Sequence, residues 1–153
     1  MLKVVLVHPE IPFNTGNVGR TCAAAGAELH LVAPLGFSLS ERRLRRAGLD
    51  YWESLNPTVH DSLEAFLRKL PADADVLAFS AEGKRTHWEA PYGEDSWLVF
   101  GSESSGLPSE LRSRWSERLY RVPMVAGARS LNLSTAAGVV IYEALRTHGP
   151  TRA

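Results

Sequence analysis

Three short segments hold the side chains best suited to binding and chemistry: residues 14–20, 101–108 and 129–138. Each is rich in Gly, Asn and Ser, and each follows an apolar run typical of a strand and leads into a helical pattern. The chain has no Gln and only four Asn, three of which (Asn14, Asn17 and Asn132) lie in these segments. Because open α/β sheets bind ligands at the carboxyl ends of their strands, we expect a ligand site there.

Several common chemistries are disfavoured by the same segments. Glycines at 101 and 106 have the spacing of a phosphate-binding loop, but Leu107-Pro108 stands where that loop needs Lys-Ser/Thr. A dinucleotide fingerprint and a serine-hydrolase elbow are both missing. The five histidines are scattered without metal-ligand spacing, and the single Cys22 forms no internal disulfide, so we expect no metal site.

Two unusual turns remain. The first has glycines at 101 and 106 around one acid, Glu103; glycines alone more often only form turns, but they also let backbone approach a ligand. In the second turn, Ser130, Asn132 and Ser134 alternate with Leu. A helix cap needs only one such polar side chain, so this turn has more of them than capping requires. The small residues at 136–138 indicate that something approaches this helix start closely.

The elements that must position these turns follow from periodicity. Apolar runs predict strands, and 3.6-residue patterns with caps predict helices, while 50–61 and 82–95 have the composition of loops. We therefore expect an α/β fold, with a mainly parallel sheet flanked by helices, in a single domain spanning 1–153. The expected strands are 2–7, 29–32, 76–79, 97–100 and 119–123, and the expected helices are 17–25, 40–47, 62–70, 108–115 and 132–147.

Composition is that of an ordinary globular domain: 153 residues, 44% hydrophobic and 22% charged, with a net charge of zero. The longest apolar runs are too short to span a bilayer and the first residues have no signal-peptide pattern, so we expect a cytoplasmic protein without membrane contact. The cations comprise 14 Arg against 3 Lys, and clusters at 42–46 and 112–121 suit either a solvated helix face or a basic binding face.

The motif segments resemble a known family. Residues 14–20 (Asn-Thr-Gly-Asn-Val-Gly-Arg), 98–108 (Leu-Val-Phe-Gly-Ser-Glu-Ser-Ser-Gly-Leu-Pro) and 129–134 (Arg-Ser-Leu-Asn-Leu-Ser) are similar, in order and position, to the three motifs of the SPOUT RNA 2′-O-ribose methyltransferases. Residues 9–14 and 43–51 resemble the minimal subgroup that acts on the tRNA wobble ribose. The likeness covers nearly the whole chain. One departure is Ser102, where the family often has Pro.

This resemblance implies a C-terminal deep trefoil knot, a homodimer, S-adenosylmethionine as methyl donor and tRNA as substrate. The implied catalytic set is Asn14, Arg20, Glu103, Ser130 and Asn132. The implied cofactor contacts are Phe79, Ser80, Gly101, Ser102, Glu103, Val122, Met124, Ser130, Leu131, Asn132 and Leu133. The candidate RNA-binding residues are Arg42, Arg43, Arg45, Arg46 and Arg129.

The roles follow from the chemistry of a weakly acidic ribose hydroxyl. A guanidinium stays protonated, so we expect Arg20 to hold the RNA phosphate and stabilise developing alkoxide charge, while the phosphate or a water accepts the proton. We expect Asn14 to support Arg20 or the ribose, Ser130 and Asn132 to fix the site geometry, and Glu103 to organise its loop and balance local positive charge. Two alternatives stay open: methylation of another tRNA or rRNA position, and a non-catalytic RNA-binding protein that retains the cofactor pocket.

Overall fold

The computed structural model describes residues 1–40, 42–48 and 51–149, and the side chain of Arg45 lies outside this described part. Its centre is a sheet of seven parallel strands in the order β3-β2-β1-β6-β4-β7-β5, which confirms the predicted α/β class. The strands are β1 (Lys3–Val7), β2 (Glu28–Val32), β3 (Thr58–His60), β4 (Val76–Phe79), β5 (Arg85–Thr86), β6 (Trp97–Phe100) and β7 (Leu119–Arg121).

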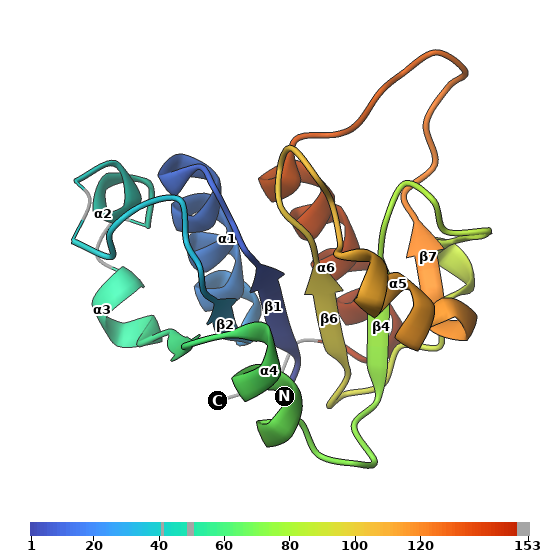
Figure 1. Ribbon diagram of the computed structural model, residues 1–153, viewed down its shortest axis with the longest axis horizontal. Helices are drawn as coiled ribbons and strands as arrows, with labels where there is room; N and C mark the ends of the chain where they lie inside the picture. Colours follow the sequence, from blue (N-terminus) through green and yellow to red (C-terminus); the bar gives the residue numbers. More distant parts are fainter. Residues whose placement is uncertain (41, 49–50, 150–153) are drawn as a thin grey trace.

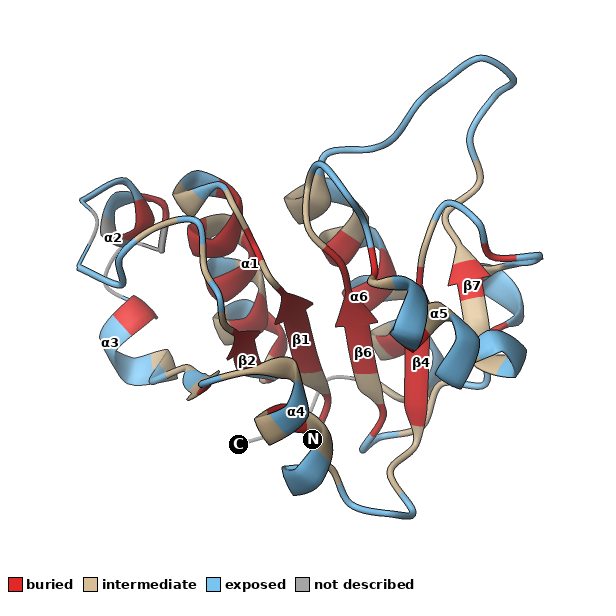
Figure 2. Cartoon of the chain, in the orientation of Figure 1, coloured by how far each residue is buried: buried red, intermediate tan, exposed pale blue. Residues whose placement is uncertain are grey.

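Helices cover both faces of the sheet (Figure 1). One face packs against α1, α6, α2 and α3, and the other against α4 and α5. The helical elements are α1 (Pro12–Ala25), α2 (Arg42–Gly48), α3 (Tyr51–Leu55), α4 (Leu63–Lys69), η1 (His87–Glu89), α5 (Ser109–Arg114), η2 (Ser116–Arg118) and α6 (Leu133–His148). Figure 2 shows the central strands as the most buried part of the chain.

The alternation of side chains in β1 explains this layering. Val4 and Leu6 point into the core under α1 and α6, whereas Val5 and Val7 point into the core under α4 and α5. All four side chains are fully buried. Strands covered on both faces have nearly continuous apolar sequence, which is why β1, β2, β4 and β6 were predictable.

The start of the first helix was predicted wrongly. It begins at Pro12 and not at residue 17, so the first motif segment forms helix and not a strand-to-helix turn. Residue 19 of this helix is a glycine because α3 packs closely on it. A Cβ at this position would stand 2.8 Å from the Trp52 ring. Glycine in this motif therefore serves helix packing, which local sequence patterns do not reveal.

The two predicted loops also contain regular structure. Residues 50–61 include α3 and β3, and residues 82–95 include β5 and η1. These elements are two to five residues long and owe their form to neighbours: β3 pairs with β2, and β5 with β7. In the segment 136–138, where a close approach was expected, Ala137 is fully buried, whereas a Cβ on Gly138 would meet nothing within 4 Å in its own chain.

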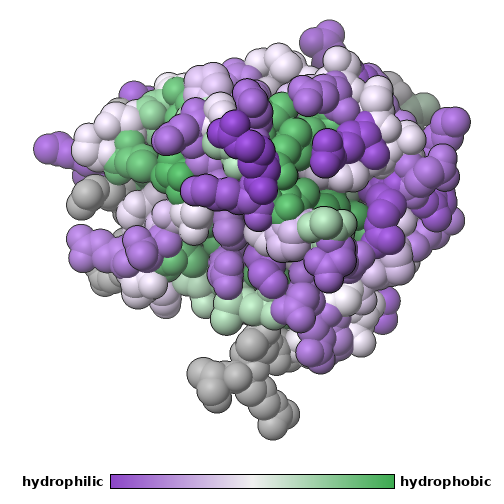
Figure 3. Space-filling view, turned by 60° about the horizontal axis from the view of Figure 1, so that its bottom comes forward, coloured by the Kyte–Doolittle hydropathy of each residue, from purple (hydrophilic) through white to green (hydrophobic). Residues whose placement is uncertain are grey.

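The surface is mixed in polarity. Figure 3, which brings the lower edge of Figure 1 forward, shows hydrophobic side chains in patches between hydrophilic ones. No helix in the described ranges is long and apolar enough to cross a membrane. The same residues contain no group of three or more His, Cys, Asp or Glu side chains that could hold a metal ion.

Candidate active site

A pocket of about 580 Å³ lies at the carboxyl ends of β4, β6 and β7. Its walls come from 79–82, 100–106, 122–136 and the start of α1. The stacked rings of Phe79 and Phe100, with centroids 5.1 Å apart and planes at 17°, line it. Between β7 and α6 the chain rises well beyond the strand ends (Figure 1), and residues 124–132 of this segment are all exposed.

The structure brings every predicted cofactor residue to this one pocket. The lining includes Phe79, Ser80, Gly101, Ser102, Glu103, Val122, Met124, Ser130, Leu131, Asn132 and Leu133. The predicted site lists did not include eight further lining residues, which are Ile11, Ala81, Glu82, Phe100, Ser104, Ser105, Gly106 and Ala136. Ala81, Phe100 and Ser104 directly adjoin a predicted cofactor residue, so adjacency to the motifs was a signal for these three.

The turn after β6 is a tight hairpin. Ser102 and Gly106 exchange two backbone hydrogen bonds, with N···O distances of 3.2 and 3.0 Å. Gly106 has φ +66°, a left-handed conformation that glycine adopts freely. A Cβ on Gly101 would stand 2.0 Å from the Gly106 carbonyl carbon, so this glycine is required by close backbone contact.

Glu103 projects from this hairpin to the beginning of α1. Its carboxylate accepts hydrogen bonds from the backbone N–H groups of Glu10 (2.9 Å) and Ile11 (2.6 Å) and from Asn14 Nδ2 (3.3 Å). The helix has no side-chain cap of its own at Ile11, so Glu103 supplies the acceptor and a negative charge at the positive helix end. Its contacts are those of a loop organiser.

A second carboxylate, that of Glu10, reaches from the segment before α1 to the hairpin after β6. Glu10 accepts hydrogen bonds from the Ser104 backbone N–H (3.2 Å) and the Ser104 hydroxyl (2.5 Å). These bonds hold the pKa of Glu10 below its usual range. The segment before α1 and the hairpin after β6 are therefore bound to each other from both sides.

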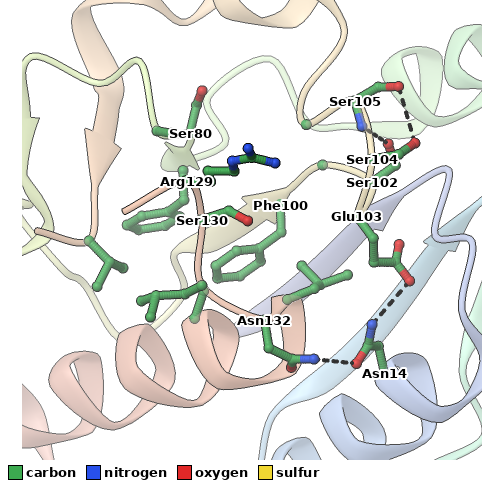
Figure 4. A pocket seen from close by; sticks show the side chains of 18 of the residues that line it. Asn14, Ser80, Phe100, Ser102, Glu103, Ser104, Ser105, Arg129, Ser130 and Asn132 are labelled. Atoms are coloured by element: carbon green, nitrogen blue, oxygen red, sulfur yellow. Dashed lines mark hydrogen bonds between the residues drawn. The ribbon is translucent and has the colours of Figure 1, made fainter. Parts of the chain in front are cut away.

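The amide network continues to the last helix (Figure 4). Asn132 Nδ2 donates to Asn14 Oδ1 at 3.0 Å, while Asn132 Oδ1 caps α6 by accepting from the Thr135 N–H. Asn14 is buried, with 6% of its surface exposed. Since each amide is held at both ends, the orientations of Asn14 and Asn132 are fixed by their partners.

Arg20 is not part of this assembly. It lies on α1 but is exposed and does not line the pocket of its own chain. It belongs to a stripe at helical spacing whose other members are Phe13, Asn17 and Ala24. By contrast, Arg129 and Ser130 both line the pocket.

Of the five predicted RNA-binding arginines, Arg129 lines the pocket, and the other four belong to α2, which lies at the same end of the molecule as the strand tips (Figure 1). Arg42, Arg43 and Arg46 are exposed there, and Leu44 and Ala47 are buried. The side chain of Arg45 is outside the described residues. The helix thus turns basic residues outward and anchors itself by its apolar ones.

The pocket has the composition of a small-molecule site. Its volume falls within the range of about 300–1,000 Å³ that such sites occupy. Aromatic rings suit an adenine face, and the backbone of the exposed 124–132 segment lies outside helix and strand, so its polar groups are suited to a heterocycle edge. The residues present fit S-adenosylmethionine.

Comparison with known proteins agrees with this geometry. A model of the SpoU rRNA Methylase family matches residues 1–142. A tRNA (cytidine(34)-2′-O)-methyltransferase of Burkholderia cenocepacia is 48% identical over 151 residues, which cover 97% of each chain. A solved structure described as giving structural insights into the 2-OH methylation of C/U34 on tRNA is 52% identical, with a TM-score of 0.89 over 95% of this chain and 89% of that one.

An AdoMet-bound rRNA methyltransferase from Sinorhizobium meliloti shares the fold at 30% identity and a TM-score of 0.84. The match covers 96% of this chain but only 56% of that one. The fold and its pocket define a methyltransferase built on a parallel α/β sheet. The chain belongs to the SpoU rRNA Methylase family.

Proposed function

We propose that this protein transfers a methyl group from S-adenosylmethionine to the ribose 2′-hydroxyl of nucleotide 34, a cytidine or uridine, in tRNA. One observation carries the proposal: the three motif segments meet at one pocket through direct bonds between residues 89 and 118 positions apart. The choice of tRNA is supported by the relative matched along 97% of its length, whereas the rRNA enzyme chain is much longer than this one.

The eleven predicted residues would hold the cofactor, with backbone near Val122, Met124 and Leu131 at the adenine edge. Phe79, which is one of them, and Phe100, which the structure adds, would lie beside the adenine face. When bound, S-adenosylmethionine supplies a methyl group that its positively charged sulfur has already activated. What the chain must add is orientation of the ribose oxygen and relief of the cost of removing its proton.

The fixed amides serve the first of these needs. Asn14 and Asn132 keep one orientation because Glu103, Thr135 and each other occupy their polar atoms. We expect Ser130, at the pocket wall, to contact the ribose, and Glu103 to act through Asn14 and the helix start without touching the reacting atoms. Preorganised polar groups lower the barrier because they need no rearrangement during the reaction.

Charge on the developing alkoxide requires a cation, and Arg20 does not line its own pocket. We propose that the protein is a homodimer in which the partner's Arg20 completes the site. The helix α1, which carries the stripe with Arg20, packs against α6, whose Val139 and Tyr142 are exposed. Apolar side chains on two packed helices suit burial by a second copy of the chain.

The protein has no net charge, so its attraction to RNA would come from local groups of arginines. Arg42, Arg43 and Arg46 on α2 and Arg129 at the pocket lie at the end of the molecule where the pocket opens, and their guanidinium groups suit phosphate contacts. We also propose that the C-terminal part of the chain forms the family's trefoil knot and that the protein acts in the cytoplasm, where tRNA is modified.

The test is transfer of tritium from labelled S-adenosylmethionine into total tRNA from a strain lacking this protein, with the modified nucleoside mapped by mass spectrometry. We expect label in a 2′-O-methylated nucleotide at position 34. Label at another tRNA position, or label in rRNA only, would contradict the proposed target while preserving the reaction. Tight cofactor binding without any label would favour a non-catalytic role.

A further inference from the structure

A second hollow, of about 400 Å³, lies directly beside the cofactor pocket. Three loops at the carboxyl ends of the neighbouring strands β2, β1 and β6 form it, and its walls include His8, Leu35 and Pro108. The hairpin 102–106 is a shared wall, because Ser102, Ser105 and Gly106 line both hollows. We call this second hollow the side groove.

The side groove is built rigidly. The Gly36 N–H donates to the Pro9 carbonyl oxygen at 2.9 Å, and a Cβ on Gly36 would stand 2.6 Å from the Glu10 carbonyl oxygen, so two of its loops touch backbone to backbone. The bonds between Glu10 and Ser104 fasten the third loop. The wall positions are therefore set before any ligand enters.

Two ionisable side chains, Glu10 and His8, line the side groove. Glu10 is already bonded to Ser104 of the hairpin, whereas His8 points its ring at a different partner. Its backbone has φ 56°, a left-handed conformation that is rare outside glycine and is found preferentially at functional sites. Its ring Nδ1 lies 3.2 Å from the Val32 carbonyl oxygen. A carbonyl only accepts hydrogen bonds, so Nδ1 carries the proton in the neutral ring and Nε2 is left as an acceptor.

We propose that the side groove receives the pyrimidine base of the nucleotide being methylated, and that His8 Nε2 recognises the exocyclic amino group of cytosine. The inference rests on the proposed function. The base and the 2′-oxygen are attached to adjacent ribose carbons, so a 2′-hydroxyl that enters the cofactor pocket brings its base to the neighbouring cavity. The shared hairpin is the boundary between the two.

The lining suits an unstacked base. Pro34, Leu35 and Pro108 give apolar contact for the ring faces, and bases taken out of a stack are held between aromatic or apolar side chains. Cytosine presents an amino donor where uracil presents a carbonyl acceptor. An Nε2 acceptor therefore favours cytidine over uridine as the better of the two substrates. The Burkholderia relative is named for cytidine(34), and the 52% identical structure is described for C/U34.

The experiment compares two tRNA transcripts that differ only in having C34 or U34, and kcat/KM is measured for the unmodified protein and for the His8→Gly variant. Glycine adopts φ 56° without strain, so this variant removes the imidazole while relieving the backbone. His8→Asn, which also tolerates a left-handed backbone, is a second variant if the first is poorly folded. Leu35→Ala is the matched control for a change in the apolar wall.

We expect the unmodified protein to prefer C34, and His8→Gly to lower kcat/KM for C34 about tenfold while changing the value for U34 less than about twofold. Leu35→Ala should weaken both substrates in parallel and leave their ratio unchanged. Equal losses for C34 and U34 in His8→Gly, or no preference in the unmodified protein, would overturn the assignment. Failure to methylate either transcript would contradict the proposed function itself.

Discussion

Substitution of Glu103 by Gln separates a structural role of this carboxylate from a chemical one. The substitution removes the negative charge and one of the two oxygens that accept the N–H groups of Glu10 and Ile11. Loss of a helix cap costs about 1 kcal/mol, and loss of a favourable charge at a helix N-terminus costs about 0.5 kcal/mol more. Ile11 is exposed, so water replaces part of the lost bonding, and these figures are upper values for that bond.

The sum of roughly 1.5 kcal/mol corresponds to a melting temperature about 3–6 °C lower for a chain of this size. Thermal unfolding followed by circular dichroism measures it, with Glu94→Gln, an exposed carboxylate outside the pocket, as the control. Methyl transfer by Glu103→Gln should fall about tenfold, because the Asn14 amide loses a fixed partner. Unchanged melting together with a loss of activity above about a thousandfold would refute the structural role and assign Glu103 to the chemistry.

Three further substitutions or conditions test other parts of the structure. Gly101→Ala should destabilise the protein by at least about 2 kcal/mol and weaken cofactor binding, because its Cβ would overlap Gly106. Denaturant unfolding measures the loss of stability, and an unchanged midpoint would contradict the close contact. Arg20→Lys keeps the charge but loses the planar fork, so methyl transfer should fall at least about tenfold with cofactor affinity unchanged, and full activity would contradict the assignment. Burial lowers the pKa values of His30 and His60 below the unfolded value of about 6.5, so the unfolded chain binds more protons than the folded one. The free energy of unfolding should therefore fall as pH drops below about 6.5. Equal melting temperatures at about pH 7.5 and 5.5 would contradict this.

The central strands and the long last helix could be predicted because their signals are local. β1, β4 and β6 are short apolar runs bounded by polar turns, and α6 carries a buried stripe from Ala137 to Ala144 with Asn132 as its cap. The convergence of the motif segments followed from a general rule, since all these strands are parallel and end at one edge. That rule places a ligand site at this edge, whereas the individual pocket residues were predicted through the resemblance of the motifs to the SPOUT family.

Features that depend on contacts between residues far apart in the chain could not be predicted from the sequence. Glu103 bonds to residues 89 to 93 positions away, and nothing in its own segment identifies those partners. The early start of α1 depends on this borrowed cap, and Gly19 is explained only by Trp52 on another helix. The side groove is likewise an outcome of three loops meeting, and His8 gave no signal in the sequence beyond its residue type.

The most direct test of the central claim removes a single oxygen from the substrate. Two tRNA transcripts that match a natural substrate are compared, one with cytidine and one with 2′-deoxycytidine at position 34, and methyl transfer from labelled S-adenosylmethionine is measured. We predict methylation of the first and none of the second, with both transcripts binding the protein to a similar extent. Undiminished label in the deoxy transcript would contradict 2′-O-methylation of nucleotide 34.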